Sequence, residues 1–160
     1  MVSESLRGVV ERLRDIIQAH RGQNLNEQDT KNAVIEPILA AIGWPKYDLR
    51  RVRAEYRHTS KDNPVDYALV AGSKPVMFVE AKALDRDIGD HKVISQVLSY
   101  AVAANVDWAM ITNGYSWDLY YTFARVQASK KLFFSTHIDD PEFIGWMSRL
   151  TPEQIGRAHV

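Results

Sequence analysis

The sequence predicts an α/β fold in which a mixed β-sheet is flanked by helices. Stretches with apolar residues at helical spacing alternate with short runs rich in β-branched and aromatic residues. Three of these extended runs follow one another across short turns, which is typical of an antiparallel meander. A helical stretch then separates two buried extended runs, and such a strand–helix–strand crossover makes part of the sheet parallel.

Two helices are predicted before any strand. Apolar residues recur every three or four positions over 6–17 behind Ser3, a candidate N-cap. Asn26 opens the second helix, whose apolar positions cover 34–42. A Gly-Trp-Pro sequence at 43–45 closes it.

The meander follows as three extended runs. They cover Val52–Tyr56, Val65–Val70 and Pro75–Lys82, and the turn signals at 61–64 and Gly72 separate them. A third helix over 93–102 then connects to the buried run at 108–112, and this is the crossover. The remaining predicted elements are strands over 116–123 and 131–137 and a last helix over 143–147, opened by Asp140 and Pro141.

The composition favours one domain. With 160 residues, 46% of them apolar, the chain is long enough to bury a sizeable core. We expect one domain over 1–160, with an N-terminal helix in 1–25, a core in 26–122 and a C-terminal strand and helix in 123–160. Twenty basic and twenty acidic residues cancel, so any nucleic-acid binding has to come from a local patch.

Residue content and spacing exclude several kinds of site. The chain has no cysteine, which removes disulfides, thiolate metal sites and thiol nucleophiles. Its nearest glycines, Gly145 and Gly156, are too far apart for a Walker A loop or a GxGxxG turn, and no histidines form an HExxH-type pair. The N-terminus lacks a signal-peptide apolar segment, and no stretch approaches the roughly 18 apolar residues of a membrane span. These features predict a soluble, cytoplasmic protein without membrane contact.

The clearest local patch runs from Lys46 to Lys61 and has six basic residues against two acidic ones. Its candidate nucleic-acid-binding residues are Arg50, Arg51, Arg53 and Arg57. On a neutral chain such a strip is suited to phosphate contacts. The alternative is a solvated strand edge that its charges protect from unwanted pairing.

Charged residues stand at the ends of two predicted strands that are otherwise apolar. Asp66 lies near the start of the second strand, and Glu80 and Lys82 end the third. Residues two apart on a strand share a face, so Glu80 and Lys82 project together. If the strands pair through the turn at Gly72, Asp66 and Glu80 meet at one end of the sheet. Mg²⁺ commonly uses one or two carboxylates together with substrate phosphates, which is what this pair offers.

Three residues on helices extend this candidate site. Glu36 is the only charge within 33–42, and burying an unpaired carboxylate is costly, so it should face a cation, a water network or Lys82. Gln96 and Tyr100 are four apart and share one flank of the third helix, where they could orient a water or a phosphate above the carboxylates.

Each feature also has a purely structural interpretation. Glu-x-Lys is a common tripeptide that usually forms a salt bridge, and Asp66 is a plausible turn residue. Glu36 fits a partly exposed helix position, and Gln96 with Tyr100 fits ordinary surface polarity. Their order along the chain, a helical glutamate followed by strand carboxylates and then a Gln-x-x-x-Tyr helix, favours a site.

In this order the chain resembles the PD-(D/E)XK nuclease superfamily, and more narrowly the N-terminal nuclease domain of type I restriction enzyme R subunits. The resemblance covers about 26–122, and its residues are Glu36 in Asn-Ala-Val-Ile-Glu-Pro, Asp66 in Pro-Val-Asp-Tyr-Ala-Leu, Glu80 and Lys82 in Val-Glu-Ala-Lys-Ala, Gln96 and Tyr100 in Gln-Val-Leu-Ser-Tyr, and the segment Ile111–Tyr120. One departure is that Val65 separates Pro64 from Asp66, where the superfamily name implies adjacency.

The resemblance implies a restriction-endonuclease-like core and a metal site. Asp66, Glu80 and the Ala81 carbonyl would ligate Mg²⁺ or Mn²⁺, and Glu36 would reach the metal through water. Lys82 would position or deprotonate the attacking water and offset charge in the transition state. Gln96 and Tyr100 would orient the site against the nucleic-acid backbone.

The resemblance further implies a metal-dependent DNA endonuclease of restriction or defence type. R subunits join this domain to a motor domain, for which 160 residues leave no room, so we expect a stand-alone nuclease or a partner of a separate motor or specificity subunit. Double-strand cleavage would require a homodimer or two successive events. The alternative is a non-cutting module of the same fold that binds nucleic acid or regulates a larger complex.

Overall fold

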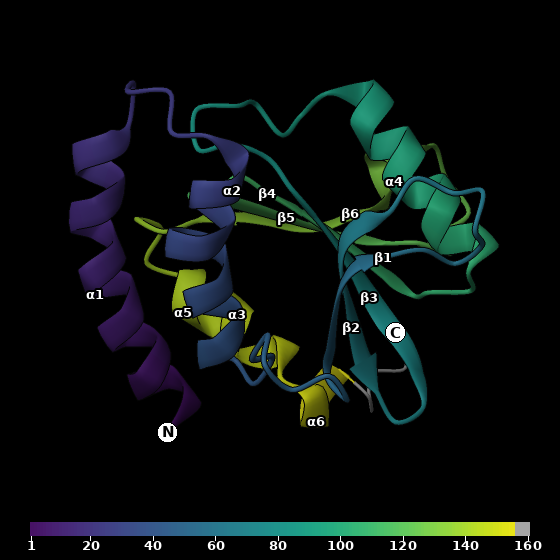
Figure 1. Ribbon diagram of the computed structural model, residues 1–160, viewed down its shortest axis with the longest axis horizontal. Helices are drawn as coiled ribbons and strands as arrows, with labels where there is room; N and C mark the ends of the chain where they lie inside the picture. Colours follow the sequence, from purple (N-terminus) through teal and green to yellow (C-terminus); the bar gives the residue numbers. More distant parts are fainter. Residues whose placement is uncertain (156–160) are drawn as a thin grey trace.

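The structure is a computed structural model that describes residues 1–155 (Figure 1). Its strands are β1 (Val52–Tyr56), β2 (Val65–Ala71), β3 (Lys74–Ala81), β4 (Trp108–Thr112), β5 (Ser116–Tyr121) and β6 (Leu132–His137). Its helices are α1 (Val2–His20), α2 (Glu27–Thr30), α3 (Glu36–Ala41), α4 (His91–Ala103), α5 (Phe143–Met147) and α6 (Pro152–Ile155). A π-helical segment, η1 (Lys31–Ile35), joins α2 to α3, and two short 3₁₀ turns are η2 (Ala128–Lys131) and η3 (Ser148–Leu150).

The described strands form one six-stranded sheet in the order β1-β2-β3-β4-β5-β6. Neighbours are antiparallel except β3 and β4, which are parallel because α4 crosses over between them. The predicted mixed sheet, with its meander followed by a crossover, is therefore confirmed.

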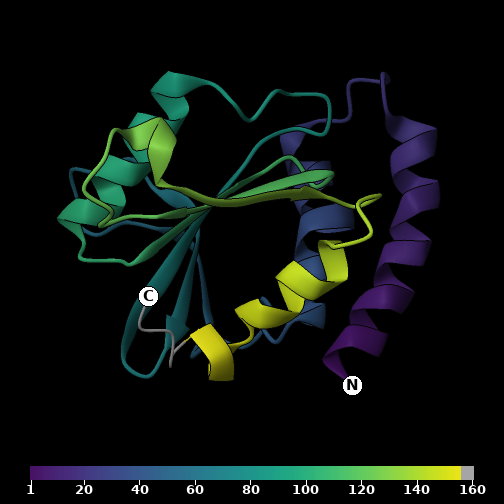
Figure 2. The same ribbon diagram turned by 180° about the vertical axis from the view of Figure 1, so that it is seen from behind.

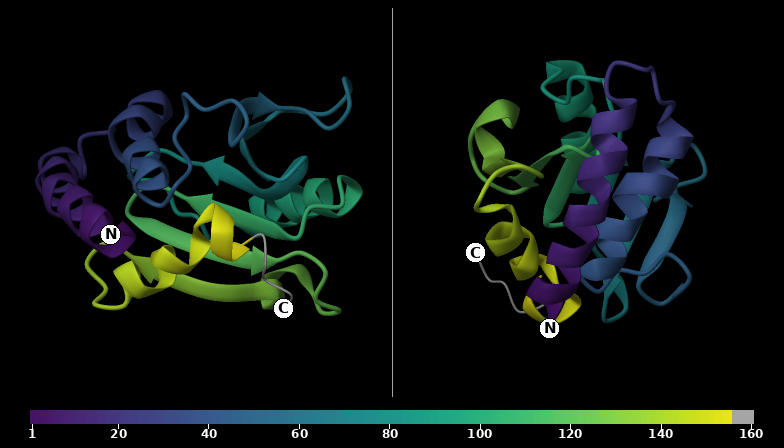
Figure 3. Two further views of the ribbon diagram at one scale, coloured as in Figure 1. Left: turned by 90° about the horizontal axis from the view of Figure 1, so that it is seen from below. Right: turned by 90° about the vertical axis from the view of Figure 1, so that its left-hand side faces the viewer.

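The sheet separates two groups of helices. Alternating strand residues such as Tyr67 and Val79 pack on a core shared with α1, α3 and α5. The opposite face, which includes Ala68 and Phe78, packs against α4. Figures 1 and 2 show α1, α3 and α5 gathered on one side of the molecule and α4 on the other. Figure 3 shows α1 lying alongside α3, with which it packs.

Several element ends differ from the sequence-based expectation. Ser3 does not cap α1, since the helix already begins at Val2 and Met1 occupies the cap position. Strand β5 ends at Tyr121 rather than 123, because the chain turns there and the Ala124 NH bonds back to the Tyr121 carbonyl. The helix predicted over 143–147 is confirmed as α5, but it is not the last one, because η3 and α6 follow it. The end of the predicted segment 123–160 lies outside the described residues.

The second predicted helix begins as expected but is not uniform. The Asn26 side chain accepts a hydrogen bond from the Asp29 NH at 2.7 Å, which confirms the predicted cap. Beyond α2, the π-helical segment η1 inserts an irregular turn before Glu36 restarts regular helix. None of the described helices combines the length and apolarity needed to cross a bilayer.

The turn between β4 and β5 packs closely against the N-terminal helical segments. The Asn113 side chain accepts hydrogen bonds from the NH groups of Tyr115 and Ser116, and the indole of Trp117 donates to the Gly114 carbonyl. Gly114 has φ +87°, and a Cβ built on it would lie 2.8 Å from Cγ1 of Val34 in η1. Only glycine lets η1 approach this turn so closely.

We predict that Gly114→Ala destabilises the protein more than Gly72→Ala. Gly72 also has positive φ, +73°, but a Cβ there meets no atom within 4 Å. The Gly72 variant should lose about 1–2 kcal/mol through backbone strain alone, and the Gly114 variant a further 1–3 kcal/mol or so from crowding Val34. Urea unfolding of both variants measures the difference, and equal losses would contradict the close approach of η1.

Candidate active site

A row of carboxylates crosses the meander at one end of the sheet. Ala54 pairs with Tyr67, and Tyr67 pairs with Val79. One position farther toward the same end of the sheet, this register aligns Glu55 on β1, Asp66 on β2 and Glu80 on β3. The predicted meeting of Asp66 and Glu80 at one end of the sheet follows from this register.

Asp66 is held by two donors that come from different elements. Its Oδ2 accepts the Ala81 NH at 2.7 Å, and its Oδ1 contacts the ammonium of Lys31. The Asp66 side chain is only 11% exposed, so these contacts replace most of the water that would solvate the carboxylate. The carboxylate is thereby fixed in place beside the end of β3.

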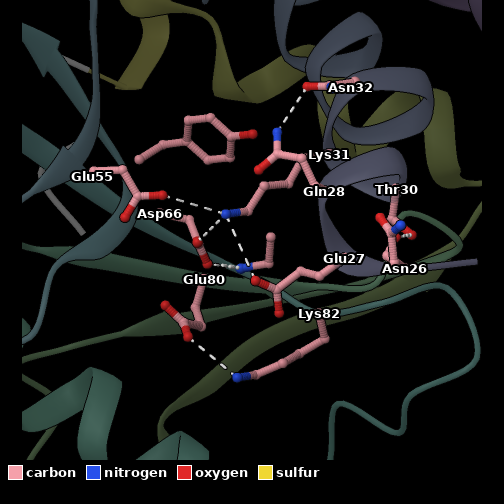
Figure 4. A network of polar contacts seen from close by, with 12 residues as sticks. Asn26, Glu27, Gln28, Thr30, Lys31, Asn32, Glu55, Asp66, Glu80 and Lys82 are labelled. Carbon is pink, nitrogen blue, oxygen red and sulfur yellow. Dashed lines mark hydrogen bonds and ion pairs between the residues drawn. The ribbon is translucent and has the colours of Figure 1, made fainter.

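Lys31 lies at the centre of this polar network (Figure 4). Its ammonium also lies 3.7 Å from Oε2 of Glu27 and 3.6 Å from Oε1 of Glu55. Burial lowers the pKa of Lys31, but the hydrogen bond and charge of Asp66, helped by Glu27 and Glu55, outweigh burial and raise it above the ordinary value. Lys31 is therefore a firmly charged counter-ion.

The local structure around η1 explains how Lys31 reaches the sheet. The hydroxyl of buried Thr30 donates to the Asn26 carbonyl at 2.8 Å and accepts the Leu84 NH at 3.1 Å. These bonds tie the end of α2 to the segment after β3. The π-helical turn begins at Lys31, and the Lys31 side chain extends over the start of β2, where Asp66 lies.

Glu80 and Lys82 form the second ion pair of the site. Nζ of Lys82 lies 3.3 Å from Oε2 of Glu80, so the two side chains share one side of the strand end, as predicted. Burial and then the negative charge of Asp66 raise the pKa of Glu80 to about 7, although Lys82 opposes the shift. A carboxyl group that titrates near neutral pH next to a second carboxylate is typical of a functional site.

Glu36 lies in different surroundings from the other carboxylates. It accepts the Tyr67 hydroxyl at 2.6 Å and lies 3.3 Å from Nζ of Lys46. The cation expected beside it is thus Lys46 and not Lys82, because Lys82 pairs with Glu80. Glu36 also lines a surface hollow of about 570 Å³ together with Lys46 and Arg51.

Gln96 and Tyr100 both lie on α4, on the side of the sheet that carries Asp66 and Glu80. Tyr100 packs beside Ala68 and Phe78, and its hydroxyl accepts the Asn63 NH at 3.3 Å. Gln96 is exposed, and within residues 1–155 it makes no hydrogen bond to the carboxylates. The structure thus brings Tyr100 to the loop before β2 but leaves Gln96 facing solvent.

The basic strip lies on and beside β1, an edge strand of the sheet. Arg53 and Arg57 are exposed, Arg51 is half-buried, and Arg50 pairs with Asp48 at 3.3 Å. Because β1 adjoins β2, this strip flanks the row of carboxylates. It is positioned to contact a polyanion that reaches the site from this edge.

Sequence reasoning missed Glu27, Lys31 and Glu55. Glu27 and Lys31 are four apart after the Asn26 cap, a spacing that pairs side chains on one helix face, and this was the available signal. The signal for Glu55 was its position on β1. It follows Ala54, the partner of Tyr67, and therefore lies level with Asp66. Glu55 also has φ +51°, an uncommon conformation for a non-glycine residue that often marks functional sites.

The donor set fits a divalent cation bound by two carboxylates. Within the described residues no three carboxylates or histidines come close enough to form a metal centre by themselves. Asp66 and Glu80 nevertheless adjoin each other, and one or two carboxylates suffice for Mg²⁺ when water and substrate oxygens complete its shell. The network has four carboxylates but only two ammonium groups, those of Lys31 and Lys82, so its charge favours an added cation.

We predict that Glu80 makes stability fall as pH rises. With its pKa raised to about 7, native Glu80 keeps a proton that the unfolded chain releases at lower pH, so deprotonation favours unfolding. Between pH 4.5 and 8 the free energy of unfolding of Glu80→Gln should rise relative to wild type by about 1–3 kcal/mol. Urea unfolding in EDTA measures this, with exposed Glu11→Gln as control. Parallel pH profiles for wild type and Glu80→Gln would refute the raised pKa.

The chain was compared with curated proteins and with solved structures. No curated protein matches the chain in sequence. The type IIG restriction endonuclease BpuSI is similar in structure, with a TM-score of 0.49 and 16% sequence identity, covering 66% of this chain and 14% of its own. A fragment of a putative HsdR subunit of a type I restriction enzyme from Vibrio vulnificus YJ016 has a TM-score of 0.48 and 22% identity, covering 68% of this chain and 25% of its own. This chain therefore spans a quarter or less of either neighbour.

The family comparison is more direct, because it covers the residues that build the site. The model of the family described as "Type I restriction enzyme R protein N terminus" matches residues 26–134, well over half of the chain. The match includes α2, η1 and every strand of the meander. The chain belongs to the family of type I restriction enzyme R protein N-terminal domains.

Proposed function

We propose that this protein is a metal-dependent endonuclease that hydrolyses phosphodiester bonds of DNA. The observation that carries the proposal is the juxtaposition of Asp66 and Glu80 at one end of the sheet, with the Lys82 ammonium 3.3 Å from Glu80. Family membership supports a nuclease domain, since the matched segment contains all three residues.

Asp66 and Glu80 would hold Mg²⁺ or Mn²⁺, together with the Ala81 carbonyl at the same strand end. The ion would supply Lewis acidity and lower the pKa of the attacking water. Glu36 was expected to reach the ion through water, but it is paired with Tyr67 and Lys46. Glu27 shares Lys31 with Asp66 and is the helix carboxylate better placed to assist at the site.

Lys82 would act on the water and on the phosphate. Its side chain is only 20% exposed and its ammonium is anchored by Glu80, so the ammonium is held at the strand end where substrate would lie. There the ammonium would position the attacking water and offset the charge that builds on the phosphate oxygens, and in its neutral amine form Lys82 could accept the proton of that water.

Residues around the carboxylates would bind the DNA backbone. Arg53 and Arg57 on the β1 edge are exposed and free to contact phosphates, with Arg50 and Arg51 beside them. Tyr100 and exposed Gln96 would contact the strand from the α4 side. A single site cuts one strand, so double-strand cleavage would need a homodimer or two successive cuts. A separate motor or specificity subunit is the further partner that we propose.

One observation favours a non-cutting binding module as second candidate. Both Asp66 oxygens already have protein donors, the Ala81 NH and the Lys31 ammonium, so the carboxylate is satisfied without metal. In such a module the network would serve stability, and the basic strip would bind nucleic acid without hydrolysis.

We predict that Asp66→Asn and Lys82→Ala each lower plasmid nicking in Mg²⁺ or Mn²⁺ by about 10²-fold or more, because they remove a metal ligand and a proton-transfer group. Incubation of supercoiled and linear DNA with metal or with EDTA measures the activity.

Asp107→Asn and Lys130→Ala are the matched controls, since both residues are exposed and lie away from the carboxylate row. They should nick at the wild-type rate. Wild-type protein that binds DNA through the strip but never cuts it, in any of these conditions, would favour the non-cutting module.

A further inference from the structure

Among the described residues, Lys31 is the only charged residue that is buried. Its side chain is 7% exposed, and its ammonium touches one carboxylate closely while two others stand slightly farther off. Asp66 alone balances the charge of this ammonium, and the other two carboxylates stand beyond the length of a good charged hydrogen bond, so ion pairing in this state does not explain their presence.

We propose that Lys31 is an internal counter-cation of Asp66 that a divalent ion displaces, and that Glu27 and Glu55 receive the displaced ammonium. This inference rests on the proposed function, because it assumes that Asp66 binds the ion. It assigns Lys31, Glu27 and Glu55 positioning roles that the nuclease chemistry itself does not require.

The first argument is electrostatic. The fixed Ala81 NH holds one lone pair of Oδ2, whereas Oδ1 contacts the movable Lys31 ammonium, so Oδ1 is the oxygen more readily given to a cation. An ammonium and a divalent ion in contact with one oxygen repel each other strongly where both are shielded from water. Binding of the ion therefore requires the ammonium to withdraw from Oδ1.

The second argument is geometric. The distances from Nζ to Glu27 and Glu55, 3.7 and 3.6 Å, are longer than those of good charged hydrogen bonds. A shift of about 1 Å of the flexible lysine side chain toward either carboxylate would bring that contact to the length of a good charged hydrogen bond. Figure 4 shows Glu55 and Glu27 on different sides of the ammonium, with Asp66 between them, so an ammonium that leaves Asp66 has a carboxylate to approach on either side.

The third argument is the strain at Glu55. Its φ of +51° is unfavourable for a residue with a side chain, and it occurs in an edge strand at the position level with Asp66. The Glu55 carboxylate is directed toward Lys31 in this conformation. A role as acceptor for Lys31 accounts for a conformation that strand pairing alone does not demand.

Binding of Mn²⁺ alone, measured by calorimetry and by loss of the free-ion electron paramagnetic resonance signal, tests the exchange. Lys31→Met should bind Mn²⁺ about 10-fold tighter or more, because no ammonium competes. Glu55→Gln should bind about fivefold more weakly, because the ammonium loses a destination. Glu55 is 63% exposed, so this variant keeps its fold even if Lys31→Met does not.

The double variant Lys31→Met/Glu55→Gln separates exchange from simpler roles. If Glu55 acts through Lys31, its substitution should change Mn²⁺ affinity less than about twofold once Lys31 is gone. If Glu55→Gln weakens Mn²⁺ binding by the same factor with and without Lys31, Glu55 is a metal ligand or acts through the electrostatic field of its charge. That result would overturn the proposal.

Asp66→Asn keeps failure of the exchange distinguishable from failure of the proposed function. Wild-type binding that Asp66→Asn abolishes, with Lys31→Met no tighter than wild type, would overturn the exchange and leave the metal site intact. Mn²⁺ binding by none of the proteins would overturn both.

Discussion

The site depends on the double anchoring of the Asp66 carboxylate. The Ala81 NH binds one oxygen and thereby joins β2 to the end of β3, where Glu80 and Lys82 lie. The Lys31 ammonium binds the other oxygen and joins the sheet to the π-helical segment. Without these donors a nearly buried carboxylate beside Glu80 would be costly, since each raises the other's free energy of ionisation. A cationic partner for Asp66 is therefore a requirement of this architecture.

The rest of the fold supports this geometry. Antiparallel pairing of β1, β2 and β3 places Glu55, Asp66 and Glu80 level with one another. The crossover through α4 brings β4 beside β3, and the Lys82 NH bonds to the Thr112 carbonyl where the two strands end. Val34 lies close to Gly114, and Thr30 bonds to Asn26 and Leu84. These contacts fix the position of η1, and so of Lys31, relative to the sheet. Each link comes from a different region of the chain.

Much of this arrangement could be predicted from sequence. Runs of alternating apolar residues separated by turn residues predicted the strands. The spacing of Asp66, Glu80 and Lys82 predicted that these side chains lie at one end of the sheet. The π-helical turn could not be predicted, because apolar spacing over 34–42 is compatible with regular helix. The partner of Glu36 also escaped prediction, since the loop holding Lys46 has no periodic pattern. Lys31 was missed because a buried lysine is recognised only once its carboxylates are brought together in space.

Crystallography with Mn²⁺ would test the central claim most directly, since the ion's anomalous scattering locates it without assumption. The account predicts one strong peak within coordination distance of both Asp66 and Glu80 at near-neutral pH, with the Lys31 ammonium moved off Asp66 toward Glu27 and Glu55. A peak at another group of carboxylates, or none beside an unmoved Lys31–Asp66 pair, would contradict it.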